Sequence, residues 1–86
     1  MFYYTYVLKS KIDNKLYVGF TDDLRSRLLE HNGGKVKSTQ SRKPLILLFY
    51  EAFSNKKDAV LREKFLKTGW GRIHLKKALK YALGGF

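Results

Sequence analysis

Residues 2–20, FYYTYVLKSKIDNKLYVGF, decide the fold of this chain, because they hold two runs of strand-forming residues around a turn. The runs cover residues 2–8 and 16–20, and both are rich in aromatic and β-branched side chains. Residues 11–15 between them include Asp and Asn, which turn easily. We therefore predict a β-hairpin at the start of the chain.

The two faces of this hairpin differ in chemistry. If its loop is even in length and free of bulges, even positions on the first strand pair with odd positions on the second. Tyr6 then shares a face with Tyr17, Tyr4 and Gly19, so that one face carries tyrosines around a glycine. The opposite face is a cleaner hydrophobic set: Val7, Leu16, Val18 and Phe20. The alternative is that these tyrosines are ordinary strand residues whose hydroxyls reach water.

The middle of the chain predicts a helix, a loop and a strand. Thr21 or Asp22 can cap a helix, which residues 32–34, Asn-Gly-Gly, should end. Residues 35–43 are polar and basic, and we predict a surface loop there. Residues 45–53 are so continuously apolar that we predict a third strand, either central in the sheet or covered on both faces.

The last third of the chain predicts two helices. Ser54 is the expected N-cap of a helix that runs to about residue 68. An amphipathic helix, ended by residues 84–85, follows with one apolar stripe: Leu75, Ala78, Leu79, Ala82 and Leu83. The predicted order is β-β-α-β-α-α, an α/β (α+β) fold in which helices flank a three-stranded, mainly antiparallel sheet. Residues 1–86 are expected to form a single domain.

Composition points to a polyanionic partner. Eighteen Lys and Arg against seven Asp and Glu give a formal net charge of +11, whose usual use is to attract DNA or RNA. A charge that only keeps the protein in solution is the alternative, and a membrane surface is disfavoured because the basic residues are spread along the chain.

The absence of cysteine excludes disulfides, thiolate catalysis and cysteine-ligated zinc. Without a long apolar run or a signal peptide, we expect a cytoplasmic protein.

The first predicted helix carries two candidate site residues. Leu24, Arg27, Leu28 and His31 follow helical spacing, so Arg27 and His31 lie on or beside the buried stripe. Arg25 is rotated away and should be solvated. An arginine so near the core needs an anion, and no nearby Asp or Glu is an evident partner. Phosphate is therefore a candidate ligand for Arg27, and the alternative is that its side chain lies over the helix edge.

The second predicted helix offers a carboxylate. Ala59, Glu63 and Leu66 follow helical spacing, which places Glu63 along an inward-facing stripe, although Leu61 and Phe65 form a competing apolar pair. Glu63 could hold a hard cation such as Mg²⁺ if waters and a substrate phosphate complete its shell. The alternative is a solvated carboxylate paired with a basic neighbour on the helix: Arg62, Lys64 or Lys67.

These weak signals, taken in order, resemble one known family. Residues 4–6 (Tyr-Thr-Tyr), residues 17–19 (Tyr-Val-Gly), Arg27, His31 and Glu63 have the order and spacing of the GIY-YIG nuclease domain. The resemblance covers nearly the whole chain and is strongest to the small single-domain bacterial members. The corresponding domain of the excinuclease is a more distant relative. The resemblance implies a metal-dependent endonuclease that hydrolyses DNA phosphodiester bonds, in DNA repair or recombination.

The same resemblance assigns roles to individual residues. Tyr6 and Tyr17 match the two motif tyrosines, Arg27 the family arginine and Glu63 the metal-binding glutamate, which would hold one Mg²⁺ or Mn²⁺. His31 matches a position that is His or Tyr in many members, and a proton relay is its implied role. Five basic residues are expected to contact the nucleic-acid backbone: Arg25, Lys35, Lys37, Arg42 and Lys43.

Two departures from the family pattern leave alternatives open. Tyr4 stands where the family name has its first glycine, and no asparagine follows Asn55, although several relatives have a late one in the active site. A non-catalytic nucleic-acid-binding module therefore remains an alternative. So does a nuclease component that becomes active only with a protein partner.

Overall fold

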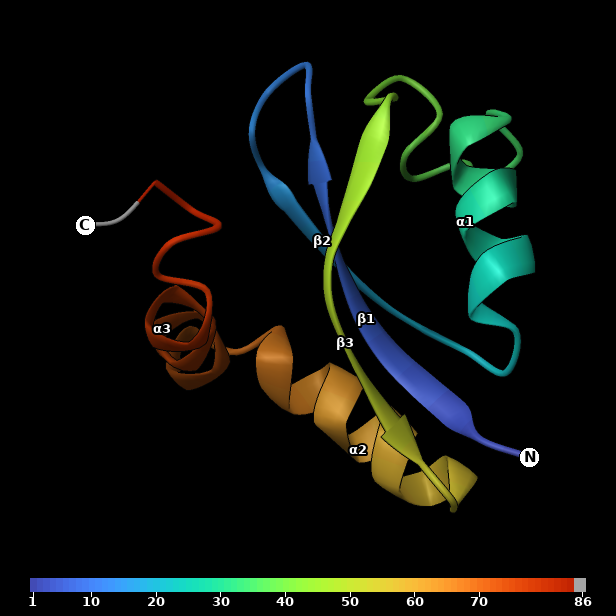
Figure 1. Cartoon of the computed structure of the whole chain (residues 1–86), viewed down its shortest axis with the longest axis vertical. Coiled ribbons are helices and arrows are strands. Elements are labelled where there is room, and N and C mark those ends of the chain that lie inside the picture. Colours follow the sequence, from blue (N-terminus) through green and yellow to red (C-terminus); the bar gives the residue numbers. More distant parts are fainter. Residues whose placement is uncertain (85–86) are drawn as a thin grey trace.

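A three-stranded sheet lies at the centre of the molecule (Figure 1). The computed structural model describes residues 1–84, in which β1 spans Tyr3–Ser10, β2 Leu16–Thr21 and β3 Leu45–Phe53. β1 pairs with both other strands, and both pairings are antiparallel. The predicted hairpin, the antiparallel sheet and the order β-β-α-β-α-α are confirmed.

The sheet order corrects one expectation about β3. The strands lie in the order β2-β1-β3, so β3 is an edge strand and β1 is central. The other prediction, a strand covered on both faces, is closer to the structure. Leu47 packs in the core on one face of the sheet, and Phe49 packs in the core on the other. Ile46 and Tyr50 are nevertheless 40% and 52% exposed. The apolar run in β3 therefore reflects cover on two faces, and this cover is incomplete.

The first helix, α1, begins slightly later than expected. It spans Leu24–Asn32, and its N-cap is Asp23, whose side chain accepts a hydrogen bond from the backbone N–H of Ser26. Thr21 instead shapes the preceding turn, because its hydroxyl oxygen accepts from the backbone N–H of Asp23. Gly33 forms the C-cap, which confirms the predicted end of the helix.

The last two helices also differ at their ends from the prediction. α2 spans Lys56–Leu66 and is capped by Asn55, one residue after Ser54. α3 spans Gly69–Ala78, so it begins earlier and ends earlier than the predicted amphipathic stripe. A Cβ added to Gly71 would lie 2.0 Å from the carbonyl oxygen of Phe65. Glycine at this position therefore lets α3 pack tightly against the end of α2.

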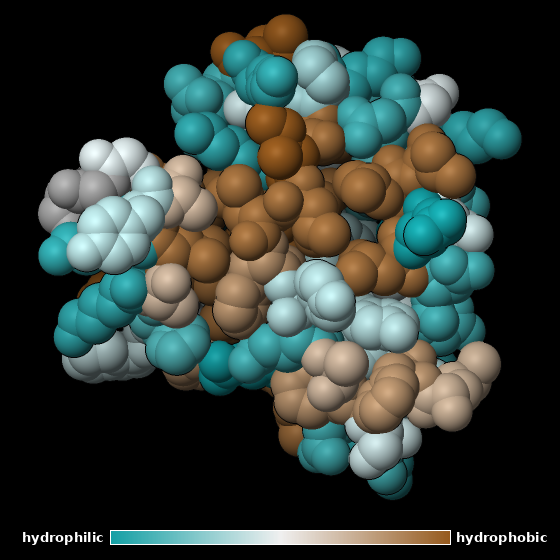
Figure 2. Space-filling model, in the orientation of Figure 1, coloured by the Kyte–Doolittle hydropathy of each residue, from teal (hydrophilic) through white to brown (hydrophobic). Residues whose placement is uncertain are grey.

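The helices cover both faces of the sheet, with α1 on one side and α2 and α3 on the other (Figure 1). The core under α1 contains Tyr6, Leu8 and Leu45, and the core under α2 and α3 is built from five buried residues: Val7, Val18, Leu66, Leu75 and Leu79. Figure 2 shows apolar side chains gathered between the strands and α3, with hydrophilic ones around them. Among residues 1–84, every helix is too short or too polar to span a membrane.

Candidate active site

The pairing register places the two motif tyrosines on the same face of the sheet. Tyr6 pairs with Gly19, and Leu8 pairs with Tyr17. Directly opposed residues of antiparallel strands point to the same face, so the predicted face of tyrosines around a glycine is confirmed. The ring centroids of Tyr6 and Tyr17 lie 6.3 Å apart. The Tyr6 side chain is only 1% exposed, so it is not an ordinary strand tyrosine that reaches water.

The Tyr6 ring packs directly against Gly19, its pairing partner on β2. A Cβ added at Gly19 would lie 2.4 Å from both the Cζ and the Oη of Tyr6, a separation that real Cβ atoms do not reach. The absence of a side chain at this position therefore lets the phenol lie flat across the strand.

We expect Gly19→Ala to displace the Tyr6 ring and to lower the free energy of unfolding by about 1–3 kcal/mol, the usual cost of overpacking. The displaced phenol should also lose its contact with His31, which changes the His31 ring signals in NMR spectra. Gly69→Ala is the matched control, since a Cβ there meets nothing within 4 Å. Unchanged His31 signals in Gly19→Ala would contradict this account.

His31 connects the tyrosine face to the loop after α1. Its ring is buried and has a hydrogen-bond partner at each nitrogen. The Tyr6 Oη lies 2.8 Å from Nε2, and the Thr39 Oγ1 lies 2.7 Å from Nδ1. The Thr39 hydroxyl donates to the carbonyl of Val36 at 3.4 Å, so its oxygen is free to accept from Nδ1–H. This leaves Nε2 as an acceptor for the Tyr6 hydroxyl. The arrangement forms a hydrogen-bond chain from Tyr6 through His31 and Thr39 to Val36.

The loop of residues 35–43 is therefore less superficial than predicted. Val36 and Thr39 are buried, and they anchor the loop beneath His31. Sequence reasoning missed Thr39, because a threonine in a polar run carries no signal of burial. Val36, the single apolar residue of the segment, was the available sign that part of it turns inward.

The electrostatics show which groups surround the Tyr6 phenol. Burial raises the pKa of Tyr6 to about 12; the Arg27 guanidinium opposes this rise, while the Tyr17 and Glu63 charges add to it. The charges of these three side chains therefore all influence the pKa of one hydroxyl. Burial and the positive charge of Arg27 lower the pKa of His31 to about 4. Tyr6 and His31 are consequently both neutral near pH 7.

We expect His31 to make the fold sensitive to acid. Its pKa is about 6.5 when unfolded and about 4 when folded, so the neutral form is favoured by the native state. The resulting stability is fully present above pH 6.5 and is lost as pH falls through 4, with about 3 kcal/mol gone by pH 4 at 1.36 kcal/mol per pKa unit. Urea unfolding from pH 7.5 to 4 should show the stability advantage over His31→Gln shrinking by this amount. An advantage that stays constant with pH would contradict the assignment, and His74→Gln serves as the control.

Arg27 lies on the half-buried side of α1, as its spacing predicts. Its Nη1 donates to Oε1 of Glu30 at 3.2 Å, so the expectation that no acidic partner lies nearby is wrong. Glu30 is three residues further along the same helix, a neighbouring position that the sequence already contained. Both side chains are partly exposed, and such an ion pair contributes about 0.3–0.5 kcal/mol. A phosphate could replace the Glu30 carboxylate at little cost.

Glu63 lies on the inward side of α2. Ala59 and Leu66 are buried, whereas the competing Phe65 is 38% exposed, so the predicted stripe is confirmed. The Oε2 of Glu63 accepts a hydrogen bond from Nζ of Lys67 at 3.0 Å, and the Glu63 side chain is 22% exposed. Glu63 therefore lies on the inward side of α2 and is paired with a basic neighbour.

Comparison with known proteins identifies the family. A family model described as the GIY-YIG catalytic domain matches residues 2–76. The chain belongs to the GIY-YIG family. It is 43% identical to the UPF0213 protein SH2523 of Staphylococcus haemolyticus over 77% of this chain and 80% of that protein. A UPF0213 protein of Bacillus pumilus is 45% identical over 81% of this chain and 70% of its own length.

A solved structure agrees with this membership. The solution NMR structure of the UPF0213 protein BH0048 from Bacillus halodurans matches with a TM-score of 0.55 at 32% identity. The match covers 99% of this chain and 87% of that chain. The resemblance to small single-domain bacterial GIY-YIG proteins is confirmed.

The GIY-YIG site offers a metal few ligands of its own. In the described part of the chain, residues 1–84, His, Asp and Glu form no group of three or more that could hold an ion. Glu63 supplies a single carboxylate. This donor set fits Mg²⁺ or Mn²⁺, which keep several waters and take further oxygen ligands from a substrate phosphate. It does not fit a closed site built from protein ligands alone.

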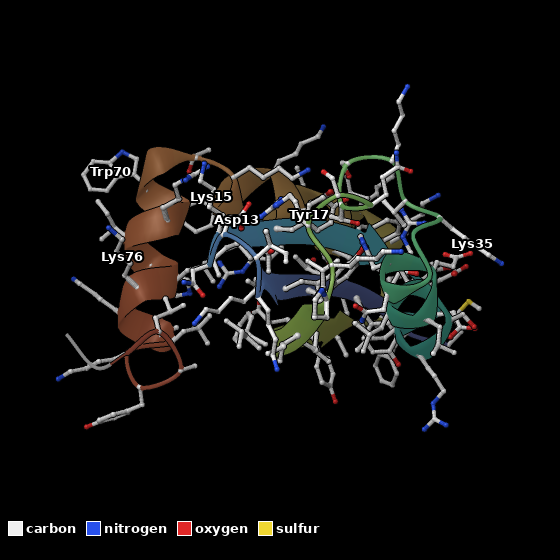
Figure 3. The ribbon with its side chains drawn as sticks, turned by 90° about the horizontal axis from the view of Figure 1, so that it is seen from above. Asp13, Lys15, Tyr17, Lys35, Trp70 and Lys76 are labelled. Carbon is white, nitrogen blue, oxygen red and sulfur yellow. The ribbon has the colours of Figure 1, made fainter. Side chains whose placement is uncertain are left out.

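Basic residues of the GIY-YIG domain lie at two ends of the molecule. Four of the five that were expected to contact nucleic acid are exposed: Arg25, Lys35, Lys37 and Lys43. Arg42 is different, because its Nε donates to Oδ2 of Asp13 at 3.1 Å, which holds it against the hairpin turn. Figure 3 shows Lys35 at one end and Lys76 at the other, with Tyr17 between them.

Proposed function

We propose that this GIY-YIG domain is a metal-dependent endonuclease that hydrolyses phosphodiester bonds in DNA. The observation that carries the proposal is the cluster of Tyr6, Tyr17 and His31, in which Tyr6 Oη lies 2.8 Å from Nε2 of His31 and the Tyr17 and His31 ring centroids are 5.0 Å apart. The charges of Arg27 and Glu63 both act on the pKa of the Tyr6 hydroxyl. An anion clamp, a carboxylate and a chain of proton carriers are the groups that phosphodiester hydrolysis needs. The family membership of the chain supports their assignment to one site.

Arg27 and Glu63 would act on the phosphate. The Arg27 guanidinium would exchange its exposed pairing with Glu30 for a phosphate oxygen and stabilise the charge that develops there. Glu63 would hold one Mg²⁺ or Mn²⁺ once the Lys67 ammonium moves aside. When bound, such an ion neutralises charge on the phosphoryl and leaving oxygens.

Tyr6 and His31 would move the proton of the attacking water. With a pKa of about 12, Tyr6 is rarely a phenolate at neutral pH. Its small phenolate fraction, which grows with pH, would accept the proton of the attacking water, and the acceptor nitrogen Nε2 of His31, 2.8 Å away, would then hold the phenol proton in a hydrogen bond. The hydroxide attacks phosphorus, the P–O bond to the leaving group breaks, and the leaving oxygen takes a proton from solvent. Thr39 would hold the His31 ring in the required tautomer, and Tyr17 would position the water or the phosphate.

The test is a cleavage assay on linear and branched DNA, and on RNA, with Mn²⁺, Mg²⁺ or EDTA. We expect cleavage of at least one DNA substrate with either cation and none with EDTA. Binding without cleavage on every substrate, with or without cell extract, would overturn the endonuclease proposal and favour a non-catalytic binding module. Cleavage only with extract would indicate a component that depends on a protein partner.

A further inference from the structure

A groove of about 870 Å³ lies between the turn of the β1–β2 hairpin and α3. Its lining includes Tyr17, a residue of the proposed active site. Much of the remaining lining is aliphatic and comes from β2, α2 and the α3 region: Leu16, Val18, Leu66, Leu75 and Leu83. None of the basic residues that the sequence singled out, except Arg42, belongs to it.

The charged residues that line this groove all carry the same sign. They come from the hairpin turn, the loop before β3, the end of α2 and α3: Lys15, Arg42, Lys67, Arg72 and Lys76. Within residues 1–84, the lining contains no Asp or Glu. In Figure 3, Lys15 and Lys76 lie on the side of Tyr17 away from Lys35. This set of five side chains is therefore a second basic surface, separate from Lys35 and α1.

Arg42 lines the groove with one guanidinium nitrogen unpaired. Its Nε is bound to Asp13, but among residues 1–84 its Nη2 is the only buried side-chain nitrogen or oxygen without a hydrogen-bond partner. A buried guanidinium N–H without an acceptor is destabilising. Arg42 therefore keeps donor capacity beyond its pair with Asp13.

We propose that this groove binds single-stranded nucleic acid, with phosphates on the basic side chains and bases against the aliphatic lining. A duplex keeps its base faces stacked inside and would leave the aliphatic lining uncovered, whereas the bases of a single strand are free to cover it. Because Tyr17 lines the groove, a strand held there would contact a residue of the proposed active site. The substrate class that follows, DNA with a single-stranded arm, rests on the proposed endonuclease function.

The test compares two double variants that remove equal charge. Lys15→Gln with Lys76→Gln alters the groove, and Lys57→Gln with Lys64→Gln alters exposed positions of α2 outside its lining. Binding of a labelled oligothymidylate and of a labelled duplex is measured in EDTA over a range of salt concentrations. We expect the groove variant to bind the single strand about tenfold more weakly. Its salt slope should fall by about 1.4, which corresponds to two lost contacts at ~0.7 each.

The remaining outcomes decide against the proposal. Equal loss of single-strand binding in both double variants would show that net charge alone is responsible. An equal loss of duplex and single-strand binding in the groove variant would remove the preference for a single strand. Because EDTA excludes metal-dependent cleavage, the groove result is independent of whether the protein proves to be an endonuclease.

Discussion

Glu63→Ala is expected to remove nearly all metal-dependent DNA cleavage and to leave DNA binding unchanged or slightly stronger. The substitution deletes the carboxylate that would hold the cation, and it also frees the Lys67 ammonium, which is 3.0 Å from that carboxylate. Both effects make the surface more positive, so binding of a polyanion should not weaken. Single-turnover cleavage with Mn²⁺ and fluorescence anisotropy in EDTA measure the two properties separately.

Asp58→Ala provides the matched control for Glu63→Ala. Asp58 is an exposed carboxylate in the first turn of the same helix, so its removal changes the net charge equally. It should leave the cleavage rate close to that of the unaltered protein. If Glu63→Ala cut DNA as fast as Asp58→Ala, the assignment of the metal site to Glu63 would be wrong.

Local patterns in the sequence predicted the features of the site that depend on spacing alone. The alternation of β1 and β2 placed Tyr6 and Tyr17 on one face, and helical spacing placed Arg27, His31 and Glu63 on inward sides. Both periodicities follow from backbone geometry, which is why they survive in the folded chain. Helix starts were less certain, because several residues in a row can act as caps.

Contacts between distant segments were not accessible in the same way. The central position of β1 follows from its long-range pairing with β3, and a continuous apolar run cannot distinguish an edge strand from a central one. The contact of Thr39 with His31 and that of Arg42 with Asp13 join segments whose relative placement only the fold determines. The Glu30 partner of Arg27 was different, since its position on the same helix made it predictable.

Tyr6→Phe is expected to lower the single-turnover cleavage rate by about 10²–10⁴-fold, the usual contribution of a general acid or base. Phenylalanine keeps the ring over Gly19 and deletes only the hydroxyl, so packing is preserved. It also leaves the buried Nε2 of His31 without its donor, which should lower the free energy of unfolding by about 1–3 kcal/mol. Urea unfolding separates this loss of stability from the loss of rate.

The pH dependence of the rate tests the role of Tyr6 most directly. Because its pKa is raised to about 12, its deprotonated form becomes more populated with every unit of pH above neutral. Cleavage by the unaltered protein should therefore accelerate from pH 7 to 9, while the residual rate of Tyr6→Phe should lose most of this dependence. Tyr4→Phe removes a hydroxyl from the same face of β1, outside the contact with His31, and should retain both rate and profile. A Tyr6→Phe protein with an unchanged rate and profile would show that the water loses its proton to another group.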